Sequence, residues 1–176
     1  MAERSVGLIV MTEIPERGLV AVLRERGRFN FEEMKREKFP GGYQVTAHGK
    51  LKRGESLPQA LLREVGEELG PRIRRWLKAN LERGRTGKPF LTEVYNGRVS
   101  EDKDVVTYAA SMPAERLHDI LLESSSGGLL LLRRQEVKRI ADLTSFGEVS
   151  GVPNRKIIAM FTYHKEAVVK AFAHFV

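Results

Sequence analysis

The spacing of apolar and polar residues predicts a mixture of strands and helices. Short apolar runs bounded by turn-forming residues are typical of strands. Two such runs, residues 6–12 and 18–23, flank the sequence EIPERG and predict a hairpin. The polar segment 24–40 predicts a loop that could include a short helix. Further strands are predicted at residues 43–46, 88–95 and 104–110, and within 129–140. The strands at 88–95 and 104–110 are expected to be joined through Asn96-Gly97 and the acidic segment 100–104.

The clearest helix is predicted from Ser56 to Leu69. Ser56 is a good N-cap, and Gln59 three residues later completes a capping-box pattern. Apolar residues recur every four positions and form one stripe, and Gly70-Pro71 supplies a stop signal. The stripe consists of Leu57, Leu61, Val65 and Leu69. Three more helices are predicted at residues 72–81, 114–123 and 153–175.

These elements predict one domain of the α/β (α+β) class over residues 1–176. The length allows one sizeable core, and we find no internal repeat or linker. No apolar run reaches the eighteen residues that a membrane-spanning helix needs. The run at residues 6–11 lacks the length and cleavage site of a secretory signal. We therefore expect a cytoplasmic protein that does not enter the membrane.

Charge and cysteine content narrow the chemistry. The chain has 30 Lys and Arg against 23 Asp and Glu, and the net charge of +7 favours anionic partners. Seven basic residues and one acid lie between residues 72 and 88, next to four glutamates between residues 55 and 68. Neighbouring acidic and basic blocks suit a site for metal ions and polyphosphate. Cysteine is absent, which excludes disulfides, thiolate metal sites and cysteine nucleophiles.

Three glutamates on the predicted helix form a candidate metal site. Glu64, Glu67 and Glu68 occupy positions i, i+3 and i+4, and therefore share one helical face. Like charges so placed repel one another, and a multivalent cation turns that repulsion into coordination. Mg²⁺ prefers such hard oxygen ligands and shares its coordination shell with water and phosphate. We expect Mg²⁺ as cofactor, with Mn²⁺ as a possible substitute.

The sequence of residues 49–71, GKLKRGESLPQALLREVGEELGP, resembles the signature of the Nudix hydrolase family, G-x5-E-x7-R-E-U-x-E-E-x-G-U, where U is a bulky aliphatic residue. Only the last position departs, where Pro71 follows the helix-ending glycine. The resemblance implies an α/β/α sandwich with a mixed central sheet. It also implies metal binding by Glu64, Glu67, Glu68 and the region of Gly49, with a Glu55–Arg63 pair that supports the site.

Residues outside the signature provide further candidates. Family members differ in the position of the general base, so we consider Glu64 and Glu67, together with Glu136 from a later segment. Glu101 and Glu123 are weaker candidates for the same role. Many relatives carry Pro-Gly-Gly just before the signature, whereas residues 46–49 of this chain are Thr-Ala-His-Gly. His48, Arg74 and Arg75 are candidate substrate-binding residues.

The resemblance implies Mg²⁺-dependent hydrolysis of a diphosphate linkage in a nucleoside diphosphate derivative, such as a nucleotide, nucleotide sugar or dinucleoside polyphosphate. Two alternatives stay open: an RNA 5′-end pyrophosphohydrolase, which the basic segment 72–88 permits, and a non-catalytic nucleotide sensor. Isopentenyl diphosphate isomerase activity is excluded because the catalytic cysteine is missing. A homodimer is a further possibility, since the apolar C-terminal helix suits either a core or an interface.

Overall fold

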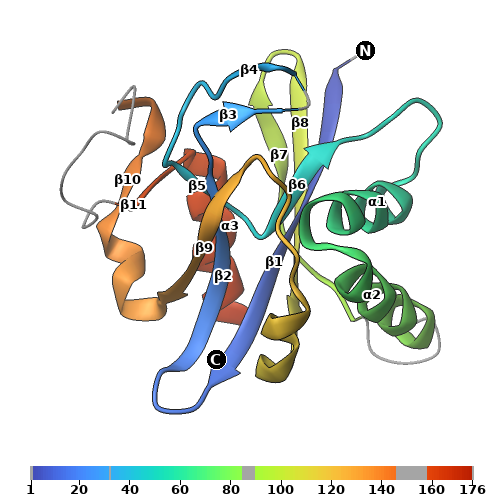
Figure 1. The fold of residues 1–176 in the computed structure, drawn as a ribbon, viewed down its shortest axis with the longest axis vertical. Helices are drawn as coiled ribbons and strands as arrows, with labels where there is room; N and C mark the ends of the chain where they lie inside the picture. The colour runs from blue at the N-terminus through green and yellow to red at the C-terminus, as the bar shows by residue number, and fades with distance from the viewer. Residues whose placement is uncertain (1, 32, 85–89, 146–157, 176) are drawn as a thin grey trace.

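The computed structural model describes residues 2–31, 33–84, 90–145 and 158–175. Its centre is a mixed sheet with helices on both faces (Figure 1). The sheet strands are β1 (Glu3–Ile14), β2 (Gly18–Arg26), β5 (Tyr43–Gln44), β6 (Ala47–Lys50), β7 (Thr92–Ser100), β8 (Lys103–Ser111), β9 (Ser126–Arg133), β10 (Ile140–Asp142) and β11 (Ile158–Met160). The helices are α1 (Leu57–Leu69), α2 (Pro71–Gly84) and α3 (Thr162–His174), with 3-10 turns η1 (Ala114–Asp119), η2 (Arg134–Arg139) and η3 (Leu143–Ser145).

The strand order β10-β11-β5-β2-β1-β8-β7 places the long strand β1 near the middle. β1 pairs antiparallel with β2 and parallel with β8, so the sheet is mixed. β6 also pairs with β1, and β9 also pairs with β2. A separate small hairpin is formed by β3 (Phe29–Asn30) and β4 (Lys35–Arg36).

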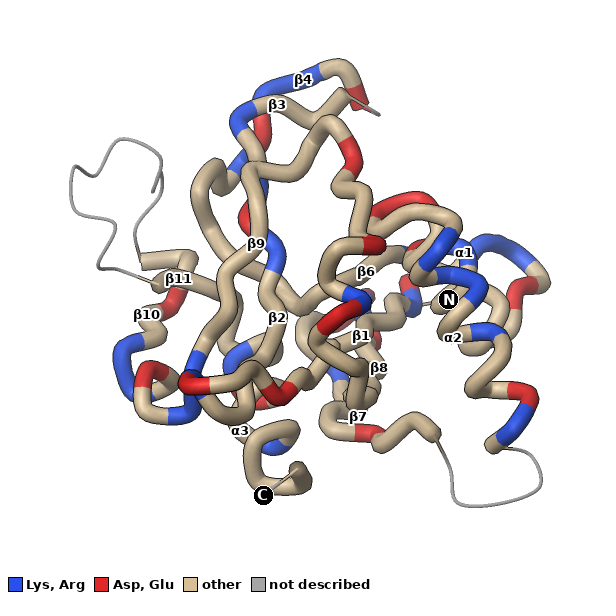
Figure 2. The backbone as a smooth tube through the Cα atoms, turned by 60° about the horizontal axis from the view of Figure 1, so that its bottom comes forward, with Lys and Arg blue, Asp and Glu red and all other residues tan. Residues whose placement is uncertain are grey.

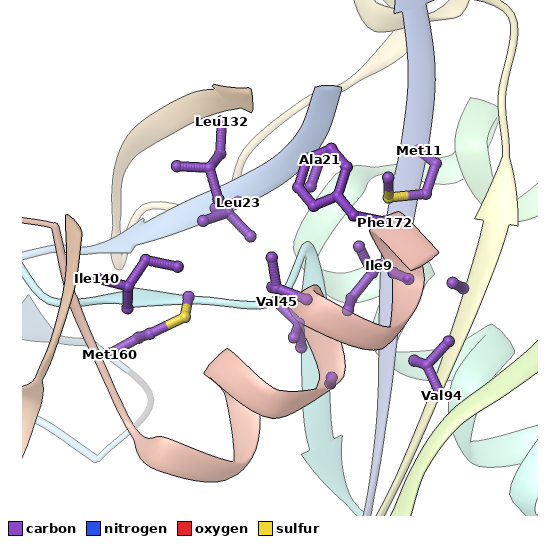
Figure 3. Close-up of a cluster of buried hydrophobic side chains, with 14 of the residues drawn as sticks. Ile9, Met11, Ala21, Leu23, Val45, Val94, Leu132, Ile140, Met160 and Phe172 are labelled. Carbon is purple, nitrogen blue, oxygen red and sulfur yellow. The ribbon is translucent and has the colours of Figure 1, made fainter. Parts of the chain in front are cut away.

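The apolar side chains of β1 contribute to a hydrophobic core on each face of the sheet, because successive side chains of a strand point to opposite sides. Leu8 and Val10 pack with residues of α1 and α2. Ile9 and Met11 pack with Phe172 of α3 on the opposite face (Figure 3). The predicted α/β/α arrangement with a mixed central sheet is therefore confirmed.

The predicted signature helix is confirmed together with its cap. The Ser56 hydroxyl accepts a hydrogen bond from the Gln59 backbone, and the Gln59 side chain accepts one from the Ser56 backbone. Gly70 ends the helix at a φ of 90°, and α2 follows directly. The β1–β2 hairpin and the helix predicted at residues 72–81 are also confirmed, each with longer bounds.

Three local predictions are wrong or incomplete because tertiary pairing determines the outcome. Asn96-Gly97 does not form the turn, since both residues pair with β8 within β7; the turn lies at Glu101-Asp102, inside the predicted acidic segment 100–104. In the described part of segment 24–40 there is no helix; the short β3–β4 hairpin is present instead. β6 was not predicted, although the strand at 43–46 is present in shorter form as β5.

The two later predicted helices begin or end elsewhere. In segment 114–123 only η1 is helical, because the backbone beyond it hydrogen-bonds to the end of α1. The Leu121 N–H donates to the Leu69 backbone carbonyl at 3.0 Å, and the Glu123 N–H donates to the Glu68 backbone carbonyl at 3.4 Å. The C-terminal helix starts at Thr162, since residues 158–160 pair in the sheet as β11. Residues 153–157 of that predicted helix, and 88–89 of the predicted strand, lie outside the described residues. No helix in the described ranges has the length and apolar character needed to cross a membrane.

Candidate active site

The signature residues meet where α1 packs against β6. Gly49 lies in β6, and a Cβ atom on this residue would fall 1.9 Å from Cδ of Glu64. Only glycine therefore leaves room for the Glu64 carboxylate against the strand. This contact explains physically why a glycine stands fifteen positions before a glutamate of the helix.

Arg63 joins the loop and the helix through one guanidinium group. Its Nε and Nη2 donate to the two oxygens of Glu55, both at 2.9 Å, and Nη2 also donates to the Lys50 carbonyl at 2.8 Å. Nη1 donates to Glu64 at 2.5 Å and to Glu67 at 3.1 Å. The bidentate contact lowers the pKa of Glu55 to about 2. The predicted Glu55–Arg63 pair is thus present.

Glu68 belongs to a second, more buried network. Its carboxylate pairs with Arg24 of β2, whose side chain is 4% exposed, and accepts the His48 backbone N–H at 2.8 Å. Arg24 also pairs with Glu123. Burial raises the pKa of Glu68 to about 8, against the opposing effect of Arg24, and burial likewise raises the pKa of Glu64. These carboxylates are therefore harder to ionise than exposed ones.

A cleft of about 600 Å³ brings the two networks together. Glu64, Glu67, Glu68 and Glu123 all line it. Cationic side chains line the same cleft. Along the chain, basic and acidic positions lie near one another around α1 and β6 (Figure 2). The cationic residues that line it are Arg24, Arg26, Lys38, Lys50, Lys52, Arg63 and Lys103. This arrangement can hold phosphate and a metal ion side by side.

Three of the predicted site residues lie away from this cleft. Glu136 is in η2, where it accepts hydrogen bonds from the backbone and side chain of Arg133. Arg74 and Arg75 are exposed on α2. The Arg74 side chain crosses Gly66, where a Cβ would meet its Cδ at 2.8 Å, so Gly66 permits close packing of α1 and α2.

The cleft also has an aromatic end that the sequence did not predict, apart from His48. The His48 and His164 rings meet edge to face, with centroids 4.9 Å apart, and Tyr163 lies 4.3 Å from His164. Burial lowers the pKa of His48 to about 3 and that of His164 well below 6.5. Both imidazoles are consequently neutral at pH 7.

We predict that these histidines make the fold sensitive to acid. Each imidazole has a lower pKa in the folded chain than its ordinary 6.5, so below pH 6.5 the unfolded chain binds more protons. The free energy of unfolding should therefore fall as the pH drops from about 6.5 towards 3. Urea unfolding of the wild type and of His164→Phe, measured between pH 7 and 4.5, checks this: the variant should show the weaker pH dependence. Identical pH dependence in both proteins would contradict it.

Comparisons with known proteins identify the architecture. No family model matches the sequence, and no curated protein is detectably similar to it. Among solved structures, the chain is similar to a MutT/nudix family protein from Enterococcus faecalis (TM-score 0.61, 16% identity, 99% of this chain and 62% of that one). A mutT/nudix family protein from Listeria innocua matches at a TM-score of 0.62, with 17% identity over 98% of this chain and 93% of that one. The chain has the Nudix fold.

A third match is the NUDIX domain of Shewanella oneidensis NrtR, solved in complex with ADP ribose (TM-score 0.58, 13% identity, 100% of this chain and 90% of that one). The present chain therefore spans nearly all of two of these Nudix structures and about three fifths of the Enterococcus protein. The Nudix fold was predicted from residues 49–71 alone, and the similarity extends over almost the whole chain.

The donor set at the Nudix helix fits Mg²⁺ in its chemistry. The carboxylates of Glu64, Glu67, Glu68 and Glu123 and the Gly49 backbone line one cleft, and Mg²⁺ prefers hard oxygen donors of this kind. Among the described residues no three acidic or histidine side chains already converge as a ligand set. The guanidinium groups of Arg63 and Arg24 pair with the carboxylate oxygens. A bound metal ion would require those oxygens to exchange partners.

Proposed function

We propose that this protein is a Mg²⁺-dependent Nudix hydrolase that cleaves a diphosphate linkage in a nucleoside diphosphate derivative. The observation that carries the proposal is the position of the signature glutamates. Glu64, Glu67 and Glu68 line one cleft with Glu123, which comes from a distant segment, and with basic residues on the same walls. Glu64 and Glu68 are 8% and 7% exposed, whereas the carboxylates of a solvated acidic helix face are exposed.

Glu64, Glu67, Glu68 and the backbone at Gly49 would hold the metal ion, with Mn²⁺ as a possible substitute. Bound Mg²⁺ would lower the pKa of a water molecule and neutralise charge on the phosphoryl oxygens. Lys50 and Lys52, whose side chains are 68% exposed, stand at the cleft to bind the remaining phosphate oxygens. Arg63 and Glu55 brace the loop against the helix.

We propose that the general base is one of the carboxylates that line the cleft. Glu64 and Glu67 remain candidates, and Glu123 replaces Glu136 as the candidate outside the signature. Glu123 is one-third exposed and pairs with Arg24, so it is both accessible to water and oriented. Glu136 is paired with Arg133 outside the cleft, and nothing in its surroundings supports a catalytic role.

The choice of substrate can begin with the ligand of a structural relative. The Nudix domain from Shewanella oneidensis binds ADP ribose, in which a diphosphate links two nucleoside or sugar groups. We propose ADP ribose as the first compound to test with this chain. The RNA alternative receives less support, because Arg74 and Arg75 lie on α2 outside the cleft.

A hydrolysis screen of the full chain tests the proposal. It should include ADP ribose, nucleoside triphosphates, nucleotide sugars, dinucleoside polyphosphates and capped RNA, each with Mg²⁺, with Mn²⁺ and with a chelator. We expect at least one compound to be cleaved at a diphosphate linkage and cleavage to stop in chelator. Hydrolysis that survives chelation would refute the metal dependence. Metal-independent binding of a nucleotide without turnover would favour the sensor alternative.

A further inference from the structure

The cleft reaches both faces of the sheet because β6 crosses it. Successive residues of β6 point to opposite sides, so Gly49 faces Glu64 of α1 while His48 faces α3. His48 contacts His164 in the first turn of α3, and its backbone N–H binds Glu68. The glutamates of α1 and the two imidazoles therefore lie on opposite sides of the single strand β6.

Four polar side chains gather on the α3 face without a partner. Among the described residues, Nε2 of His48, Nδ1 of His164 and the hydroxyls of Ser5 and Thr107 are buried and make no hydrogen bond. Two of the four lie beside Gly7, where an added Cβ would lie 3.2 Å from the Thr107 hydroxyl and 3.4 Å from Cδ2 of His48, and Ser5, His48 and His164 line the cleft. Buried polar groups in folded proteins nearly always have a partner. Such a set therefore indicates a hydrogen-bonding group that binds here.

Aromatic rings form the wall beside these atoms. Phe161 and Tyr163 are parallel, with centroids 5.7 Å apart and an interplanar angle of 6°. His48, His164, Phe161 and Tyr163 all line the cleft, and His164 is 1% exposed. Flat π surfaces favour a planar ring by stacking or edge contact. They interact less favourably with a phosphate group or an aliphatic chain.

We propose that the α3 face of the cleft binds a planar heteroaromatic group of the substrate, of the nucleobase class, and that His48 and His164 determine specificity by hydrogen bonding to its edge. The proposal rests on the proposed function, in that the adjoining glutamates would hold the metal ion while Lys50 and Lys52 bind the diphosphate. An uncharged imidazole carries one donor and one acceptor, which matches a base edge that has both. A phosphate group offers acceptors alone and uses only half of this capacity.

Equilibrium binding in the absence of metal tests this site without hydrolysis. With EDTA present, calorimetry on the full chain compares the adenosine, guanosine, cytidine and uridine diphosphates with ribose 5-diphosphate and inorganic pyrophosphate. At least one nucleoside diphosphate should bind about tenfold more tightly than both base-free probes, since one or two hydrogen bonds plus stacking are worth about that factor. Equal affinity for ribose 5-diphosphate would overturn the proposal and indicate a sugar site.

Two variants assign the preference to the histidines. His164→Phe keeps an aromatic ring but removes both nitrogens, and it should abolish most of the roughly tenfold preference while pyrophosphate binding stays within about twofold. His48→Phe removes the same two nitrogens at the less enclosed position and replaces His164→Phe where circular dichroism shows that variant unfolded. The matched control is His118→Phe, at an exposed histidine of η1 outside the cleft.

The outcomes separate this inference from the proposed function. Unchanged base preference in both folded variants, or equal loss of pyrophosphate binding, overturns the role of the histidines. Base-selective binding that depends on them, in a protein that hydrolyses none of the compounds with Mg²⁺, supports this site and refutes the proposed hydrolase.

Discussion

Glu67→Gln is expected to reduce Mg²⁺-dependent hydrolysis by at least about 100-fold, which corresponds to about 2.7 kcal/mol of activation free energy. The amide loses one metal-binding carboxylate oxygen but keeps the size and shape of the side chain. Steady-state rates on the best substrate of the screen measure the loss, and calorimetric titration with Mg²⁺ should show weaker metal binding.

The fold should survive this change. The Glu67 side chain is 53% exposed, and its contacts are an i,i+4 pair with Arg63 and a 3.8 Å pair with Lys52. Such exposed pairs contribute about 0–1 kcal/mol each, so the free energy of unfolding should change little. Glu82→Gln is the matched control, since Glu82 is 62% exposed and forms an i,i+4 pair with Lys78 on α2. Full activity in Glu67→Gln would remove Glu67 from the site.

The signature helix α1 was predictable because its signals are local. The Ser56–Gln59 capping box, the four-residue apolar repeat and the terminal glycine all act within a few residues of one another. The i, i+3, i+4 spacing of the glutamates then places them on one side without any knowledge of the rest of the chain. The same reasoning predicted the β1–β2 hairpin.

The partners of those glutamates were not predictable, because they come from distant segments. Arg24 pairs with Glu68 and with Glu123, which are 44 and 99 positions away in the sequence. Within its own segment Arg24 is one of several arginines in a polar stretch. Its burial follows only from the pairing of β2 with β1 and β9, which encloses it. The sequence likewise gives no sign that Glu123 lines the cleft and Glu136 does not, because that depends on the same long-range pairing.

His164 shows how a wrong boundary hides a site residue. A helix running from residue 153 would have placed His164 near its middle, as one position among many. The pairing of β11 with β10 and β5 instead starts the helix at Thr162, and His164 therefore lies in its first turn beside His48. Parallel pairing between remote strands leaves no local sequence signal.

Gly49→Ala is expected to impair catalysis about as strongly as loss of a glutamate, again by roughly 100-fold. The new Cβ would lie 1.9 Å from Cδ and 2.0 and 2.2 Å from the two oxygens of Glu64, so the carboxylate must leave its position. Because the displaced atoms are the end of a flexible side chain, the cost in stability should stay within about 1–3 kcal/mol. Activity, Mg²⁺ titration and urea unfolding measure the three effects separately.

The strand glycine Gly97 provides the matched control, since Gly97→Ala brings a Cβ only to within 3.2 Å of the Tyr95 hydroxyl, in β7. A double-mutant cycle then identifies the cause. If Gly49→Ala acts by displacing Glu64, combining it with Glu64→Gln should lower the rate little further than Glu64→Gln alone, because both changes remove the same group. Additive losses would mean that Gly49 serves the reaction through its own backbone, and that the close approach of Glu64 to β6 is only a packing contact.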